Sequence, residues 1–87
     1  MGVDMDFRLS DHAKKEMARR QIPGHVLDSV LHQPQQVVPE SKGRKAYQSQ
    51  ISFGGKMFLV RAIVIETLRP PLVVTVYRTS KISKYWR

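Results

Sequence analysis

Four side chains in this sequence could together cleave an RNA phosphodiester without a metal ion. That reaction needs a base for the 2′-hydroxyl, cations for the pentavalent phosphorane and an acid for the leaving 5′-oxygen. His12 or Tyr77 would act as base or acid, and Arg61 with Arg78 would stabilise the phosphate. Carboxylates do not cluster in the basic half of the chain, so a nuclease with two metal ions is not expected. We also expect no cofactor.

Residues 71–87 combine positive charge with aromatic rings. Cations contact phosphates and aromatic rings stack on bases, so such a stretch can hold single-stranded nucleic acid. The alternative is a solvated tail in which Trp86 only fixes the chain end on the domain. The residues that we expect to bind the nucleic-acid strand are Arg44, Lys45, Lys81, Lys84 and Tyr85.

The formal net charge of +8 falls almost entirely in the second half of the chain. Residues 1–40 hold five Lys or Arg against six Asp or Glu, whereas residues 41–87 hold ten against one. Such a half should attract polyanions, with an affinity that falls steeply as salt rises. It contains no basic amphipathic helix for a membrane surface. A basic surface without any partner is the alternative.

Length and composition indicate one small intracellular domain. At 87 residues the chain can bury a single modest core, so we expect one domain over residues 1–87. Without cysteine it forms neither a disulfide nor a thiolate metal site. No apolar run approaches the ~20 residues of a membrane span, and the polar start lacks the apolar part of a signal peptide. We therefore expect a soluble protein of the cytoplasm.

Two helices are predicted in the first part of the chain. Ser10 is a natural N-cap and Asp11 complements the helix dipole, which places the first helix over residues 11–20. Pro23 suits the start of the second helix, and Pro34 ends it. Apolar residues at helical spacing mark the inner faces: Ala13, Met17, Ile22, Val26, Leu27, Val30 and Leu31.

The rest of the chain predicts an antiparallel sheet. The expected strands are 36–39 at an edge, 44–53, 57–65 and 72–79, with turns at 41–43, 54–55 and 67–70. The apolar run at 72–77 indicates a central strand covered on both faces. The predicted fold is α+β, with two N-terminal helices packed on one face of a three- to four-stranded antiparallel sheet.

Arg61 interrupts an apolar strand and therefore needs a special environment. A desolvated guanidinium is costly unless it meets a carboxylate or an anion, and the second half of the chain offers only Glu66. We therefore expect Arg61 to line a cleft on the sheet face away from the helices, together with Tyr77 and Thr75. The alternative is an Arg61 that extends into solvent from an edge strand.

The histidines lie near the two predicted helices. His12 falls in the first turn of the first helix, where the helix dipole favours the neutral imidazole of a general base. An ordinary surface position is the alternative. His25 and His32 lie seven residues apart without a third ligand, so we expect no metal site.

Short motifs along nearly the whole chain carry a resemblance to a known family. They are Leu9-Ser10-Asp11-His12-Ala13, Met17, Arg19-Arg20-Gln21-Ile22, Pro34, Gly43-Arg44, Tyr47 and Thr75-Val76-Tyr77-Arg78-Thr79. The chain resembles a small bacterial domain family that starts with H-A-x-x-R-M-x-x-R-G-I and ends in a T-V-Y-type strand. It departs where Lys15-Glu16-Met17 replaces Arg-Met and where Gln21 replaces Gly. That family is similar to the barnase, EndoU, colicin and RelE-like ribonucleases, many of them toxins of toxin–antitoxin systems, which implies a RelE-like fold and a nuclease ancestry.

The leading hypothesis is a toxin-like, metal-independent endoribonuclease that acts on RNA, either free or ribosome-bound. The first alternative is a nucleic-acid-binding module without catalysis, because basic charge, aromatic rings and a small sheet serve binding equally well. The second is a protein whose basic face docks an acidic partner, as an antitoxin would. Exposed strand edges leave a homodimer and an antitoxin complex open.

Overall fold

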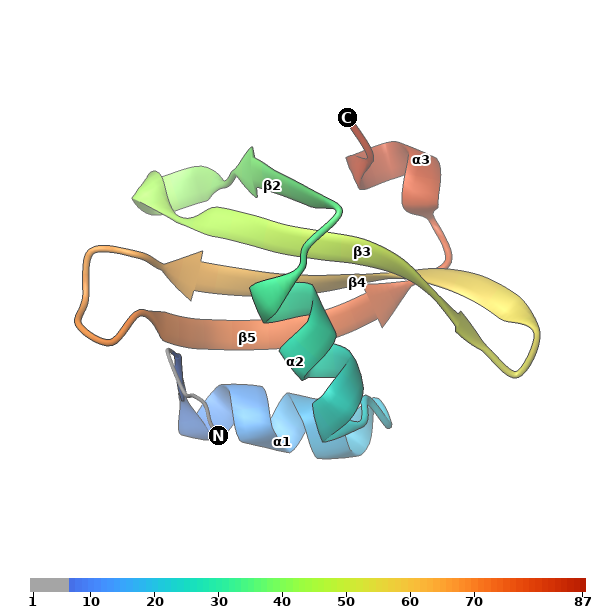
Figure 1. The fold of residues 1–87 in the computed structure, drawn as a ribbon, viewed down its shortest axis with the longest axis horizontal. Helices are drawn as coiled ribbons and strands as arrows, with labels where there is room; N and C mark the ends of the chain where they lie inside the picture. The colour runs from blue at the N-terminus through green and yellow to red at the C-terminus, as the bar shows by residue number, and fades with distance from the viewer. Residues whose placement is uncertain (1–6) are drawn as a thin grey trace.

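A computed structural model describes residues 7–87 and shows two helices packed on one face of a five-stranded sheet (Figure 1). The α-helices are α1 (Asp11–Arg19), α2 (Gly24–His32) and the short α3 (Ile82–Tyr85), and a 3-10 turn, η1, covers Ser41–Gly43. The strands are β1 (Arg8–Leu9), β2 (Gln36–Pro39), β3 (Lys45–Phe53), β4 (Lys56–Ile65) and β5 (Leu72–Thr79). The α+β class and the two helices on one sheet face are as predicted.

The strand order is β1-β5-β4-β3-β2, and only the pair of β1 with β5 is parallel. The sheet is therefore mixed and five-stranded, where three or four antiparallel strands were predicted. Strand β1 escaped prediction because a strand of two residues is too short to show alternation of apolar and polar side chains. It pairs Arg8 with Leu72 and Leu9 with Val73 at the outer side of β5.

The central strand covered on both faces is β4, and the prediction that β5 has this role is wrong. Residues 59–64 of β4 are all buried. In β5, Val73 and Val76 are buried, whereas the residues around them are partly exposed. The reason is that β1 pairs with only the first two residues of β5. Among residues 7–87, the rest of β5 therefore has a neighbouring strand on one side only, that of β4.

Local signals define both N-terminal helices. Ser10 is the N-cap of α1: its Oγ accepts a hydrogen bond from the Ala13 amide at 3.0 Å and donates to the Val74 carbonyl at 2.7 Å. The cap thus also ties α1 to β5. Arg20 follows α1 as the C-cap, and Gln21 turns the chain with a φ of 53°. Helix α2 begins directly after Pro23.

The main core lies between the two helices and the sheet. Its buried members are Ala13, Ile22, Val26, Leu27, Val30, Leu31, Val60, Ala62, Val64, Val73 and Val76. A smaller cluster of Val38, Ala46 and Ile63 lies against Tyr77 on the opposite face, where α3 is also found (Figure 1). Within residues 7–87, no helix has the length and apolar character needed to cross a membrane.

Candidate functional site

Arg61 lies in a buried hydrogen-bonded cluster, with only 3% of its surface exposed. Its Nε donates to Gln48 at 2.8 Å, one terminal nitrogen donates to the Tyr77 hydroxyl at 2.6 Å, and the other donates to the Glu40 carboxylate at 2.9 Å. Each nitrogen of the guanidinium therefore has a partner within the protein. The expectation that Arg61 lines a cleft is wrong.

The aromatic ring of Tyr85 covers the same guanidinium. The centroid of the ring lies 4.2 Å from Arg61 Cζ. The backbone carbonyl of Tyr85 accepts a hydrogen bond from the Gln48 side chain at 3.2 Å. The Gln36 side chain joins this arrangement to the chain end, because it accepts from the Arg87 amide and donates to the Arg87 carbonyl. Helix α3 is thus held over Arg61 from β2 and β3.

Sequence analysis identified the face of Arg61 but not its carboxylate. Arg61 pairs with Tyr77 across β4 and β5, and Thr75 pairs with Ile63, so all four side chains share the face away from α1 and α2. The carboxylate partner is Glu40, where the sequence pointed to Glu66. Glu40 follows β2, and the pairing of β2 with β3 carries it to Arg61 from the acidic half of the chain.

Tyr77 is held in its protonated form. Burial raises the pKa of the Tyr77 phenol, and the hydrogen bond from Arg61 offsets part of that rise. A phenol that keeps its proton can donate it to a leaving oxygen, but it is a poor base at neutral pH. Of the two roles predicted for Tyr77, the environment favours the acid.

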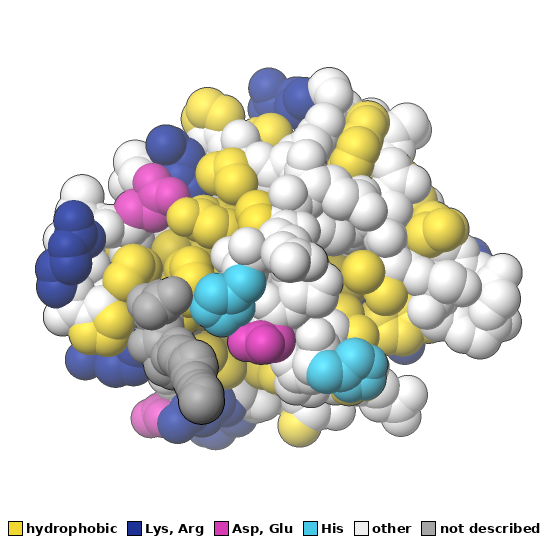
Figure 2. Space-filling model, viewed as in Figure 1, with side chains coloured by type: hydrophobic (Ala, Val, Ile, Leu, Met, Phe, Trp, Pro, Cys, Tyr) yellow, Lys and Arg dark blue, Asp and Glu magenta, His cyan; other side chains and the backbone are white. Residues whose placement is uncertain are grey.

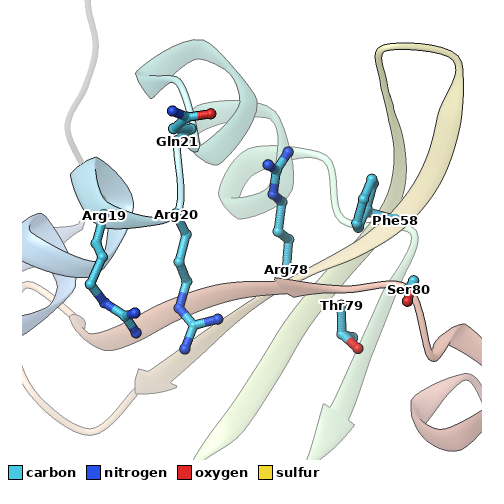
Figure 3. Close-up of a pocket in the computed structure, with 7 residues that line it drawn as sticks. All are labelled: Arg19, Arg20, Gln21, Phe58, Arg78, Thr79 and Ser80. Carbon is cyan, nitrogen blue, oxygen red and sulfur yellow. The ribbon is translucent and has the colours of Figure 1, made fainter.

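An open pocket of about 410 Å³ lies on the helix side of the sheet, at the C-terminal end of β5 (Figure 3). It is built from the end of α1, the start of β4 and the end of β5. Figure 3 shows Arg19 and Arg20 side by side, directed from α1 toward β5, and Arg78 standing on β5 between Gln21 and Phe58. The lining residues are Arg19, Arg20, Gln21, Phe58, Arg78, Thr79 and Ser80.

Arg78 is the pocket arginine without a carboxylate partner among the described residues. It pairs with Val60 across β4 and β5, which puts it on the helix side of the sheet. Its Cζ lies 4.3 Å from the Phe53 ring centroid and 4.8 Å from that of Phe58. Among residues 7–87 no carboxylate is within ion-pair distance of it. The aromatic rings hold the guanidinium by its face and leave its N–H groups for a ligand.

The other two arginines share one carboxylate. Glu16 Oε1 lies 2.8 Å from an Arg19 nitrogen and 2.7 Å from Arg20 Nε. The hydrogen bonds from Arg19 and then from Arg20 lower the pKa of Glu16 to about 2, so this carboxylate is ionised at neutral pH. Three guanidinium groups against one carboxylate leave a positive pocket.

The remaining predicted residues do not converge on one centre. His12 is exposed in the first turn of α1, whereas Arg19 and Arg20 are at the opposite end of that helix. Arg44 and Lys45 lie at the start of β3, and Lys45 Nζ is 3.6 Å from Glu66. On the face in Figure 2, Lys and Arg side chains lie around the rim rather than in one field.

The residues predicted to hold nucleic acid near the end of the chain also lie apart from one another. Lys81 and Lys84 are exposed beside α3, whereas Tyr85 covers the buried Arg61. The structure therefore brings together Arg61, Tyr77 and Tyr85 on one face of the sheet and puts Arg78 on the other face.

Sequence analysis did not select Arg19 and Arg20 for the site, although both are visible as a basic pair at the end of a predicted helix. Their proximity to Arg78 depends on how α1 crosses β5, and spacing along the chain carries no information on that crossing. Arg20 also approaches the other face of the sheet, because its Cζ lies 5.9 Å from the Tyr77 ring centroid. The pocket and the Arg61 cluster are therefore neighbours at the outer side of β5.

Two further observations concern metal binding and similarity to known proteins. Within residues 7–87 no three His, Asp or Glu side chains are grouped so that they could hold a metal ion. Comparison of the chain with protein-family models, with curated proteins and with solved structures found no match.

Proposed function

We propose that this protein binds single-stranded RNA and holds its phosphates in the pocket of Arg19, Arg20 and Arg78. The observation that carries the proposal is that three arginines, from two separate segments, line one open pocket with a single carboxylate beside them. Guanidinium groups suit phosphate because their planar fork can donate two parallel hydrogen bonds to phosphate oxygens.

The charge distribution supports a polymeric anion as the ligand. Residues 41–87 hold ten Lys or Arg against one Glu, and the exposed Lys81 and Lys84 follow the pocket residues Thr79 and Ser80 along the chain. Such a surface attracts a phosphate backbone over distance and gains affinity from released counterions. The resemblance to RelE-like ribonucleases favours RNA over DNA, and a RelE-like relationship of the fold belongs to this proposal.

Metal-independent cleavage of the bound RNA is the second candidate function. The observation in its favour is that Arg20, which lines the pocket, lies 5.9 Å from the ring of Tyr77, a phenol that stays protonated. Tyr77 would then donate a proton to the leaving 5′-oxygen, while Arg20 stabilises the phosphorane. His12 is at the other end of α1 from the pocket, so a different group would serve as the base.

A single assay tests both candidates. Labelled single-stranded RNA is incubated with the protein in EDTA at several salt concentrations, and both binding and products are measured. We expect binding that weakens as salt rises, and a loss of affinity in Arg78→Ala with a salt slope shallower by about 1. Lys14→Ala removes an exposed charge from α1, the helix that carries Arg19, at a position outside the pocket. This variant should behave like the parent protein.

The products separate the two candidates. Intact RNA that remains bound supports a binding module. Cleavage to 2′,3′-cyclic phosphate ends that is lost in a folded Tyr77→Phe variant supports the ribonuclease. If the protein binds no RNA even at low salt, or if Arg78→Ala binds as well as the parent, the pocket is not an RNA site.

A further inference from the structure

The charge of the pocket matches one kind of phosphate better than another. Arg19, Arg20 and Arg78 contribute three positive charges, and Glu16 removes one, so two remain. A phosphodiester inside an RNA strand carries one negative charge. A terminal phosphate monoester carries about −1.5 to −2 at neutral pH. The pocket is therefore close to neutral with a bound monoester and keeps an excess positive charge with a diester.

The size and lining of the pocket suit a phosphate together with part of a nucleotide. Its volume of about 410 Å³ falls within the range of about 300–1,000 Å³ that is typical of small-ligand sites. One wall is the stack of Arg78 on Phe58, which offers a flat surface for a base or sugar. This combination of a cationic and a flat apolar wall is what a nucleotide end requires.

One hydroxyl group, that of Ser80, completes the lining. Thr79 also lines the pocket, but its side chain points to the face of β5 opposite Arg78, because it pairs with Leu59 while Arg78 pairs with Val60 (Figure 3). Ser80 is exposed next to it in the same lining. A terminal phosphate has three oxygens that can accept hydrogen bonds, one more than an internal diester has, so it can use the Ser80 hydroxyl in addition to the guanidinium groups.

We infer that the pocket of Arg19, Arg20 and Arg78 receives the terminal phosphate monoester of an RNA strand. This inference rests on the proposed RNA binding and specifies which part of the RNA enters the pocket. A free nucleoside monophosphate has the same chemistry as an RNA end. The strand beyond the terminal phosphate then gains affinity from the basic residues that follow the pocket along the chain.

Binding of matched oligonucleotides tests the inference. Three single-stranded RNAs of one sequence carry a 5′-phosphate, a 3′-phosphate or hydroxyl groups at both ends, and their affinities are compared by fluorescence anisotropy at one salt concentration. A terminal phosphate at one end should raise the affinity about tenfold over the hydroxyl-ended strand. The difference should disappear in Arg78→Ala and persist in Lys14→Ala. Arg19→Ala, at a side chain that is 64% exposed, is the second variant if Arg78→Ala does not fold.

Each outcome separates the inference from the proposed function. Equal affinity for the three RNAs, with binding still dependent on Arg78, overturns the terminal-phosphate pocket and keeps RNA binding. Binding of a nucleoside monophosphate without binding of any RNA keeps the monoester pocket and overturns RNA as its ligand. If neither the RNAs nor the nucleoside monophosphate and inorganic phosphate bind, both the inference and the proposed function are wrong.

Discussion

Arg61 and Arg78 lie on opposite faces of the sheet, although they stand on neighbouring strands. The register pairs Arg61 with Tyr77 and Val60 with Arg78. Paired residues share a face and successive residues alternate, so Arg78 points to the helix side while Arg61 points away from it. One arginine is consequently enclosed within the protein and the other lines an open pocket.

Arg61 should be essential for stability and dispensable for binding. Arg61→Ala leaves Glu40, Gln48 and Tyr77 without their shared donor, and we expect a loss of about 3 kcal/mol in the free energy of unfolding by urea. Glu40→Gln should cost less, because its side chain is 31% exposed and an amide can still accept the hydrogen bond. An Arg61→Ala protein with parental stability and no affinity for RNA would reverse the roles that we assign to the two arginines.

Arg78 should act through its planar guanidinium as well as its charge. Arg78→Lys keeps the charge, so the dependence of RNA affinity on salt should change little, whereas the affinity itself should fall several-fold because the stacking and the paired donors are lost. Arg78→Ala should change both quantities. Equal affinities of the arginine and lysine proteins over a salt titration would show that only charge matters at this position.

The carboxylate of Glu16 should remain ionised down to about pH 2. Its pKa is lowered from an ordinary 4.5 to about 2 by hydrogen bonds from Arg19 and Arg20. Because the folded-state pKa is the lower one, the stability that Glu16 contributes is complete above about pH 4.5 and is lost as the pH falls through 2. An NMR titration of the Glu16 side-chain carboxyl carbon measures this directly. A midpoint near 4.5 would mean that neither arginine holds Glu16 in solution.

Tyr47 should titrate late in alkali. Burial, followed by the hydrogen bond that its hydroxyl donates to Glu66, raises its pKa from 10.0 to about 12. Its contribution to stability is therefore complete below pH 10 and is lost as the pH rises through 12. Ring resonances in NMR should show this late step, and the step should be missing in Tyr47→Phe. Ionisation of Tyr47 near pH 10 would contradict the partly buried hydrogen bond to Glu66.

Gln36 should hold the chain end over Arg61. Its side chain bonds both the amide and the carbonyl of Arg87, at 3.2 and 2.7 Å. In Gln36→Ala we expect faster hydrogen exchange of the Trp86 amide, which otherwise donates to the Ile82 carbonyl at 2.9 Å. Gln33→Ala, at an exposed glutamine without contact to Arg87, is the control. Unchanged exchange in Gln36→Ala would show that the stacking of Tyr85 on Arg61 is enough to hold α3.

Local patterns along the sequence determine most of the secondary structure. The Ser10 cap, the two prolines around α2 and the Gly54-Gly55 turn each act through backbone chemistry within a few residues, and the observed elements begin and end close to the predicted positions. Likewise, Arg61 in an apolar strand already indicated the face away from the helices, although the sequence predicted a cleft there and the structure shows a buried cluster.

The partners of these residues were decided only by the tertiary structure. Glu40 reaches Arg61 because β2 pairs with β3, and Arg19 and Arg20 reach Arg78 because α1 crosses β5. Both meetings depend on register and on helix placement, which are set by packing over the whole core and leave no periodic signal along the chain. The sequence by itself therefore determined the longer elements and which side chains are unusual, whereas packing decided the short β1 and α3 and which side chains meet.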